Sequence, residues 1–215
     1  AVIITSDHGE NMGELGIYSE HATADYSTCR IPLIVKWPGA QKRKVCRGLY
    51  GNIDLLPTVA QLLDLEPQDH WDGRSFADAI TKNTEQGRSS LVISQMAHVC
   101  QRSALFDRWL SIRTYHAGYH LFDDEMLFDL QNDPYEQRDV KEKHPDVCAR
   151  GAKIILDWHD EMMKKSDSPI DPLWTVLQEG GPFHTQGHLP AYLERLKATG
   201  REEGARRLVE KYPDV

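Results

Sequence analysis

The chain has 215 residues, of which 40% are hydrophobic, and its formal net charge is −8 at pH 7. This composition is typical of a globular protein with one ample core or two smaller ones. The acidic balance argues against a nucleic-acid partner, because phosphate backbones bind clustered Lys and Arg. No apolar run has the length of a membrane span, so we expect no membrane partner. The four cysteines form no C-x-x-C pair, which favours a reducing compartment such as the cytoplasm.

The first ten residues predict a buried strand that delivers polar side chains. Residues 1–4 are apolar and three of them are β-branched, which fits a strand with both faces covered in an α/β sheet. Asp7 and His8 follow at the carboxyl end, where ligands gather in such sheets, and Gly9 lets the backbone turn closely past a bound group. A carboxylate beside an imidazole suits a divalent cation. The alternative is that Asp7 only caps the turn.

The α/β pattern continues to residue 88. Residues 21–29 predict a short helix, and residues 31–39 predict a second apolar strand that closes with a Pro-Gly turn. A short strand is expected at residues 45–50. Residues 52–63 then predict a helix with a capping Asn or Asp, a proline in its first turn and one apolar face. A second short helix is expected at residues 74–82.

The pattern changes at residue 89. Four runs separated by short polar turns predict an antiparallel sheet, and residues 142–165 predict a long helix with one apolar face. We therefore predict an α/β domain over residues 1–88, an antiparallel sheet with a helix over residues 89–165, and a helical tail over residues 166–215. The four runs are residues 91–94, 103–109, 110–115 and 120–130.

Four segments, in this order, resemble the type I sulfatases of the alkaline-phosphatase superfamily. Residues 5–10 (TSDHGE) are similar to the second metal-binding motif of that family, and residues 30–39 (RIPLIVKWPG) to the strand that follows it. Residues 52–58 together with the DGRS sequence at 72–75 are similar to the next helix and loop. Residues 127–136 (LFDLQNDPYE) are similar to a segment of the C-terminal subdomain. The fold class implied is α/β: the C-terminal part of an alkaline-phosphatase-like domain, followed by a small α+β subdomain.

The resemblance implies a sulfuric ester hydrolase whose nucleophile is a formylglycine made from Cys or Ser in a C-x-P-x-R or S-x-P-x-R motif. No cysteine or serine of the chain has that context. We therefore expect a C-terminal fragment of a sulfatase, with the formylglycine on a segment before residue 1, and no activity from this fragment alone. An exposed sheet edge is expected at the cut, which self-association into a homo-oligomer would cover.

The resemblance assigns Asp7 and His8 to a divalent metal site, with Ca²⁺ as the ion and Mn²⁺ as the alternative. His21 stands about where sulfatases carry a lysine that contacts the sulfate and the leaving oxygen. Its imidazole would serve as a cation or general acid, and the alternative is that His21 caps the next helix. His184 and His188, four residues apart, could share a metal on a helix, but the neighbouring glycines favour a loop over the rim of the active site that helps to select the substrate.

Two other functions fit the same residues. The D-H-G-E motif also serves phosphoryl transfer, so the chain could belong to a phosphonate monoester hydrolase or phosphodiesterase of the same superfamily. A non-catalytic interaction or dimerisation domain is the alternative from a different class. Activity on an aryl sulfate separates the enzyme from the interaction domain, and the identity of the nucleophile separates sulfatase from phosphatase.

Overall fold

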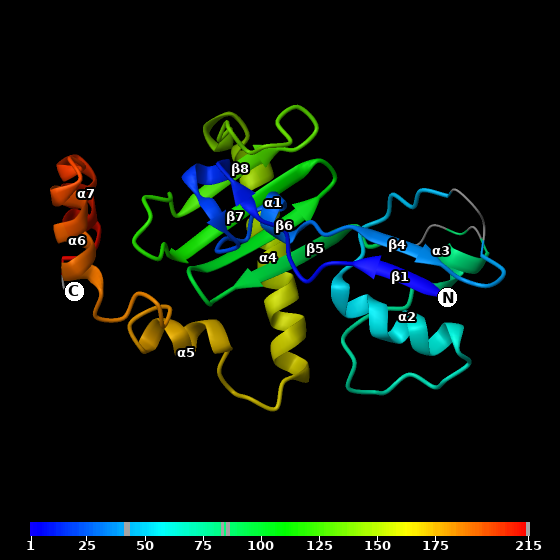
Figure 1. Cartoon of the computed structure of the whole chain (residues 1–215). Helices are drawn as coiled ribbons and strands as arrows, with labels where there is room; N and C mark the ends of the chain where they lie inside the picture. The colour runs from blue at the N-terminus through cyan, green and yellow to red at the C-terminus, as the bar shows by residue number, and fades with distance from the viewer. Residues whose placement is uncertain (41–43, 83, 85–86, 214–215) are drawn as a thin grey trace. The chain divides into compact units, whose positions relative to one another are not determined.

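The computed structural model describes residues 1–40, 44–82, 84 and 87–213, and Figure 1 shows its elements. The chain divides into two compact units, one made of Ala1–Gly9 with Arg30–Leu91 and the other of Glu10–Cys29 with Val92–Val215. Within the described ranges, no helix combines the length and the hydrophobicity that crossing a bilayer requires. The ranges 1–88, 89–165 and 166–215 stay predictions about the order of domains along the sequence.

The first unit contains a two-stranded antiparallel sheet. Strands β1 (Val2–Thr5) and β4 (Leu33–Lys36) pair with Val2 opposite Lys36 and Thr5 opposite Leu33. The two strands were predicted, but the predicted burial of the first is wrong, because Val2 is 50% exposed and Ile4 is 55% exposed. Its apolar sequence makes burial favourable, yet a sheet of two strands offers too few neighbours to cover both faces.

The helices of the first unit come after a buried aspartate, Asp54, in the sequence. The turn η2 (Asn52–Asp54) leads into α2 (Leu55–Leu62), and α3 (Ala77–Thr81) follows later. Asp54 is fully buried, and its carboxylate accepts hydrogen bonds from the backbone N–H groups of Gly51 (2.8 Å) and Arg74 (2.7 Å) and from the guanidinium of Arg88. The predicted helix over residues 52–63 is confirmed. The strand predicted at residues 45–50 is reduced to one bridge between Leu49 and Arg88.

The second unit is built on a four-stranded sheet in the order β5-β6-β7-β8. Residue alternation in β7 sends Leu110 and Ile112 to one face and Trp109 and Ser111 to the other, and β6 and β8 pair with β7 in antiparallel fashion. The antiparallel sheet predicted from residue 89 onward is confirmed. The strands are β5 (Ser90–Gln95), β6 (Cys100–Phe106), β7 (Trp109–His116) and β8 (Glu125–Asp129).

Each face of this sheet has its own cover (Figure 1). The long helix α4 (Pro145–Lys165), which confirms the predicted helix, packs on one face with Cys148 and Ile155 against Phe106 and Leu127. Residues 10–29 cover the other face, where they form a core cluster with β7 and β8. Their elements are β2 (Asn11–Met12), η1 (Glu14–Gly16), β3 (Tyr18–Glu20) and α1 (Tyr26–Cys29).

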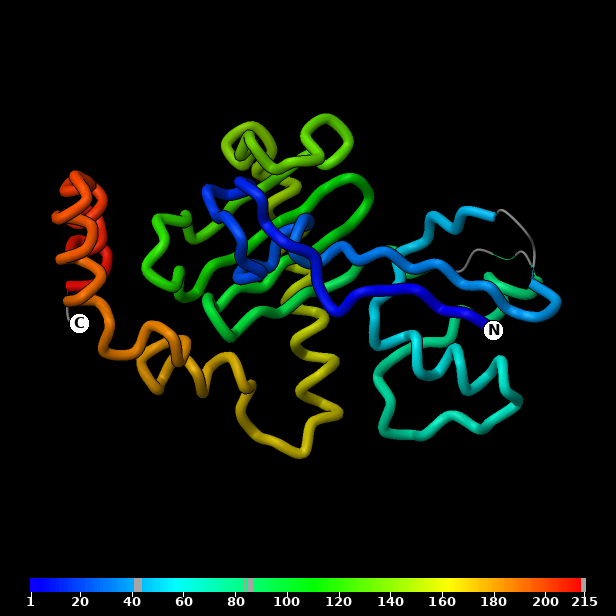
Figure 2. The backbone as a smooth tube through the Cα atoms, viewed as in Figure 1, coloured from blue at the N-terminus to red at the C-terminus, as the bar shows by residue number. Residues whose placement is uncertain are grey.

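The C-terminal part of the second unit is helical, as predicted. Figure 2 follows the backbone from α4 through α5 (Pro172–Gln178) to the antiparallel-running pair α6 (Leu189–Ala198) and α7 (Glu202–Lys211). The two last helices share a small apolar cluster with Tyr119. Asp171 accepts a hydrogen bond from the N–H of Leu173 at the start of α5 and pairs with Arg102 of β6, so this helix is tied to the sheet.

Candidate metal centre

The residues of the D-H-G-E segment follow β1 directly, at its carboxyl end. Asp7 has a side chain that is 88% exposed, and its Oδ1 accepts a hydrogen bond from the backbone N–H of His8 at 3.0 Å. Nδ1 of His8 lies 2.7 Å from the carbonyl oxygen of Gly9. Because a carbonyl only accepts, Nδ1 of His8 is the donor in this contact, which leaves Nε2 as the ring nitrogen that a metal would bind. Both turn capping and metal binding are therefore compatible with this segment.

Glu10 and His21 lie together in the second unit. Glu10 precedes β2, His21 follows β3, and Nδ1 of His21 is 3.6 Å from Oε2 of Glu10. The backbone carbonyl of His21 accepts a hydrogen bond from the side-chain amide of Gln95 at 3.2 Å, which ties this segment to the end of β5. The amide N–H groups at the start of α1 bind Asp25 and Glu136, so the predicted alternative that His21 caps this helix is wrong.

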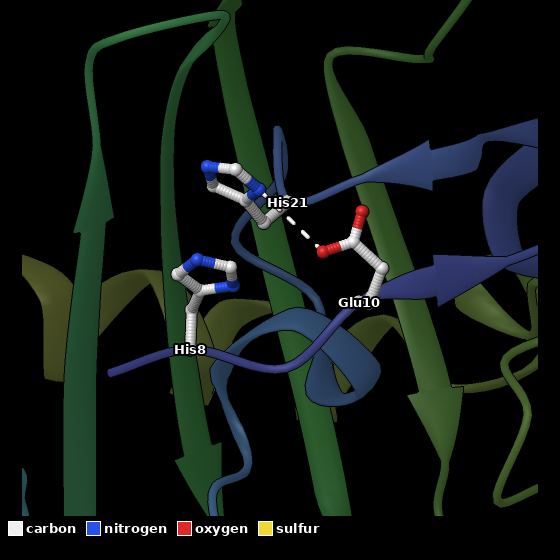
Figure 3. A group of neighbouring side chains, drawn as sticks. All are labelled: His8, Glu10 and His21. Atoms are coloured by element: carbon white, nitrogen blue, oxygen red, sulfur yellow. Dashed lines mark ion pairs between the residues drawn. The ribbon is translucent and has the colours of Figure 1, made fainter. Parts of the chain in front are cut away.

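Figure 3 shows how the side chains of His8, Glu10 and His21 gather, with the Glu10 carboxylate directed toward His21. One possible ligand atom of each residue lies within 4.8 Å of the other two. Two imidazole nitrogens and a carboxylate oxygen are a donor set for borderline divalent ions such as Mn²⁺. Ca²⁺ is held by oxygen ligands, so this set fits Ca²⁺ less well.

Glu10 is the residue that the sequence reasoning did not select. Glu10 is the last residue of the D-H-G-E segment and stands two residues after His8, so the same motif could have identified it as a candidate ligand. Asp7 and His8 were the predicted ligands, and only His8 belongs to the group of three whose ligand atoms approach one another. The assignments of Asp7 and His8 to a metal and of His21 to catalysis stay predictions.

A buried polar network positions this part of the second unit. Asn11, which follows Glu10, is fully buried and donates to Oδ1 of Asp25 at 3.2 Å. Thr28 donates to the side-chain oxygen of Asn11 at 2.6 Å, and Thr23 donates to Asp25. The network therefore holds the start of β2 beside the segment that carries His21.

The segment from Gly180 to His188 is a series of turns, as predicted, and not a helix. Its His184 ring stacks on the ring of His98, with centroids 4.6 Å apart. The His98 ring in turn lies edge-on to the ring of His21, with centroids 6.0 Å apart. The segment therefore reaches the neighbourhood of His21, whereas its effect on substrate choice stays a prediction.

Comparison with known families identifies the chain. A family profile described as "N-sulphoglucosamine sulphohydrolase, C-terminal" matches residues 13–164, which is more than half of the chain. The chain belongs to this sulfatase family. The profile match includes His21 but begins after the D-H-G-E segment, so the candidate ligands at residues 7–10 lie outside it.

Proteins similar in sequence to this chain are also named as sulfatases. The chain is 29% identical over 168 residues to an uncharacterized sulfatase, YidJ, of Escherichia coli K12, covering 75% of this chain and 32% of that protein. It is 28% identical over 165 residues to arylsulfatase K of Gallus gallus, covering 72% of this chain and 30% of the relative. The chain thus spans about a third of the length of these relatives.

Solved structures share the fold. A structure described as a 2-O GAG sulfatase superposes with a TM-score of 0.64 at 20% identity, covering 79% of this chain and 38% of its own. A phosphonate monoester hydrolase from Silicibacter pomeroyi superposes with a TM-score of 0.57 at 22% identity, covering 77% and 35%. At these identities the likeness establishes the fold, which is the predicted alkaline-phosphatase-like α/β class.

Proposed function

We propose that this chain is the C-terminal part of a sulfate ester hydrolase and contributes part of its divalent metal site. The observation that carries the proposal is the group of His8, Glu10 and His21 in a chain that belongs to a sulfatase family, with ligand atoms within 4.8 Å of one another. In this proposal the nucleophile and the remaining ligands come from a segment outside residues 1–215, because no Cys or Ser here has the formylglycine context.

The chemistry of sulfate esters explains the choice of residues. A bound divalent cation would neutralise the nonbridging oxygens and so lower the barrier for an attacking oxygen. His8 and Glu10 of this group, together with the predicted ligand Asp7, would hold the cation, which leaves His21 beside it for the leaving oxygen. The imidazole donor favours Mn²⁺ over the Ca²⁺ that the family resemblance suggests, since Ca²⁺ selects oxygen ligands.

His21 would act on the leaving oxygen. Its Nδ1 side faces the Glu10 carboxylate at 3.6 Å, and this neighbour fixes the orientation of the ring. The opposite nitrogen, Nε2, is then directed away from Glu10 and can donate a proton to the alcohol oxygen as the S–O bond breaks. His21 thus takes the part that the family resemblance gives to a lysine.

The first test is activity of the full-length protein on an aryl sulfate with added Mn²⁺ or Ca²⁺. General acid catalysis is worth roughly 10²–10⁴ in rate, so His21→Ala should lower kcat by at least about 100-fold. His188→Ala changes an exposed histidine of the same unit and should leave kcat unchanged. Wild-type turnover of His21→Ala would contradict the role of this residue, and turnover by residues 1–215 alone would contradict the external nucleophile.

The second test measures the metal directly. Titration with Mn²⁺, followed by its electron paramagnetic resonance signal, should give weaker binding to Glu10→Gln than to wild type, while Glu142→Gln serves as an exposed acidic control in the same unit. Tighter binding of Ca²⁺ than of Mn²⁺ would reverse the proposed preference. A phosphonate monoester assayed beside the aryl sulfate decides between the two hydrolase classes, and turnover of neither substrate with either metal favours the interaction domain.

A further inference from the structure

His21 lies at a boundary between exposed and buried parts of the chain. On its N-terminal side, Tyr18 is 69% exposed, and Ser19 has a backbone φ of 58°, which residues with a side chain seldom adopt. On its C-terminal side, the four residues from Ala22 to Asp25 are each exposed by 2% or less. The side chain of His21 itself is 45% exposed. The buried segment therefore fixes the chain from Ala22 onward, and the position of His21 depends on contacts of its own.

A fully buried glutamine anchors the segment that follows His21. Gln101 of β6 accepts a hydrogen bond from the backbone N–H of Ala24 at 3.1 Å and donates to Oγ1 of Thr114 on β7 at 3.0 Å. Asp25 in turn accepts a hydrogen bond from the side-chain amide of Asn11 at 3.2 Å. These contacts hold residues 24 and 25 without the help of His21, so we expect a variant that loosens His21 alone to keep its fold.

A second glutamine, Gln95 at the end of β5, contacts His21 itself. Its Nε2 donates to the backbone carbonyl oxygen of His21 at 3.2 Å, and its Oε1 accepts from the backbone N–H groups of Met96 and Ala97 at 3.1 Å each. The oxygen of this side-chain amide thus faces two donors, and its nitrogen faces an acceptor. A neutral amide satisfies both, whereas an ionised carboxylate accepts and cannot donate. The surroundings therefore favour glutamine over glutamate at residue 95.

We infer that Gln95 is a positioning residue, which holds the backbone of His21 so that the imidazole can donate a proton to the leaving oxygen. The inference rests on the proposed function, because it needs His21 as the general acid. A displacement of a catalytic group by about 1 Å can lower a rate about 100-fold, so one hydrogen bond to its backbone matters. The turn that Gln95 closes leads directly to His98, whose ring lies edge-on to the His21 ring. Gln95 therefore orders the chain on two sides of the imidazole.

Two substitutions in the full-length protein separate the donor of Gln95 from the turn that it closes. Gln95→Glu keeps an acceptor for the N–H groups of the turn but loses the donor to His21, whereas Gln95→Met has a similar length and loses both. On an alkyl sulfate, whose leaving oxygen needs a proton, we expect each variant to lower kcat about tenfold or more, with KM within about twofold of wild type. The loss should be smaller on 4-nitrophenyl sulfate, whose leaving group departs without a proton. Gln131→Glu adds the same charge at an exposed glutamine of the same unit and should leave kcat unchanged.

A double-mutant cycle with His21→Ala distinguishes positioning from general support of the fold. If Gln95 acts through His21, Gln95→Glu should change kcat by less than about twofold once residue 21 is alanine, whereas the loss from a merely structural role would be the same in both backgrounds. Wild-type kcat of Gln95→Glu on the alkyl sulfate, or the same fold loss with and without His21, overturns the inference and leaves the hydrolase proposal intact.

A measurement that needs no turnover separates this inference from the proposed function. NMR of the full-length protein with 13C-labelled histidine gives the imidazole signals of His21 and His188, which are identified by their absence from His21→Ala and His188→Ala. Gln95→Glu and Gln95→Met should shift the His21 signal and leave the signal of the exposed His188 unchanged. An unchanged His21 signal in both variants overturns the inference. A shifted His21 signal in a full-length protein that hydrolyses no sulfate ester supports the hold of Gln95 on His21 and overturns the hydrolase.

Discussion

Glu136 is a buried residue next to Asp25, and these surroundings determine whether its carboxyl group is charged. The residue is 3% exposed, and its Oε1 accepts a hydrogen bond from the backbone N–H of Tyr26 at 2.9 Å. Burial first, and the nearby Asp25 carboxylate second, together raise the pKa of the Glu136 carboxyl to about 8. Glu136 is therefore neutral at mildly acidic pH, where two adjacent buried charges would otherwise repel each other.

Stability should fall as the pH rises through this titration. The folded-state pKa of about 8 lies above the ordinary value of 4.5, so the stabilisation by neutral Glu136 is fully present below about pH 4.5 and is lost toward pH 8. Glu136→Gln stays neutral and keeps an oxygen acceptor for Tyr26. We expect this variant to exceed wild type in unfolding free energy by about 4 kcal/mol at pH 8.5 and by only about 1 kcal/mol at pH 5.

Urea unfolding at pH 5, 7 and 8.5 measures this difference. Glu142→Gln removes an exposed carboxylate of the same unit and should keep the pH dependence of the wild type. If Glu136→Gln also kept that dependence, the charge of Glu136 could not be its source.

The sequence revealed the site residues that a local motif carries and missed those that only the fold brings together. Asp7 and His8 were selected from a short pattern in which Glu10 was also available, and His21 was selected because it stands about where the resembling family carries a lysine. The contact between Glu136 and the start of α1 joins positions 110 residues apart. No periodicity or spacing reports such a pair, because it depends on the sheet that brings both segments together.

At the scale of elements, prediction succeeded where the hydrophobic pattern is long or clearly bounded. Helix α4 buries one face against the sheet, so its apolar residues recur with the helical period. Strands β6 to β8 are covered on both faces, and apolar runs between short polar turns predicted them. The pattern was less informative for residues 21–29, where helix α1 occupies only Tyr26–Cys29. Thr23 and Asp25 are buried there in side-chain hydrogen bonds, which compete with a helical backbone.

Two helical glycines give a matched test of element packing. A Cβ at Gly151 of α4 would lie 2.4 Å from Oγ and 2.5 Å from Cβ of Ser111 on β7, whereas a Cβ at Gly204 of α7 would meet no heavy atom within 4 Å. Gly151→Ala should therefore lower the unfolding free energy by about 1–3 kcal/mol, because the clash outweighs the gain in helix propensity. Gly204→Ala should raise it by about 0.5–1 kcal/mol.

Thermal and urea unfolding of the two glycine variants beside wild type give the sign of each change. Equal stability of Gly151→Ala and Gly204→Ala would contradict the tight packing of α4 on the sheet. Helix propensity alone predicts equal stabilisation at the two positions, so the difference between the variants isolates the packing contribution.

Over the whole molecule, apolar burial is divided unequally between the two units. The three apolar core clusters found among the described residues consist of residues of the second unit. The fully or nearly buried apolar residues described in the first unit are three alanines, Pro57 and Phe76, while β1 and α2 expose large side chains such as Ile4 and Leu56. Apolar residues are favourable to bury, and for this reason the sequence predicted buried strands here. The apolar pattern does not show whether other segments of the described chain pack on these strands.

The first unit therefore depends strongly on the polar network of Asp54. Burial alone would raise the pKa of the Asp54 carboxyl, but hydrogen bonds from Arg88 and from the backbone N–H groups of Arg74 and Gly51 outweigh it and hold the pKa below 3.8. A depressed folded-state pKa contributes stability above the ordinary value, and this contribution is lost as the pH falls through the folded-state pKa. At neutral pH the contribution is fully present.

Removing this charge should weaken one unit and spare the other. Asp54→Asn leaves the guanidinium of Arg88, whose side chain is 16% exposed, without its buried carboxylate partner, and breaking such a pair costs up to about 3–5 kcal/mol. We expect amide hydrogen exchange in α2 to accelerate about 100-fold or more, while amides of β6 and β7 keep their wild-type rates, because each unit has its own buried residues. Asp69→Asn, an exposed control in the first unit, should change neither set. Equal acceleration in α2 and in β6 and β7 would instead mean that the two units unfold together, and the polar network of Asp54 would then support the stability of the whole chain.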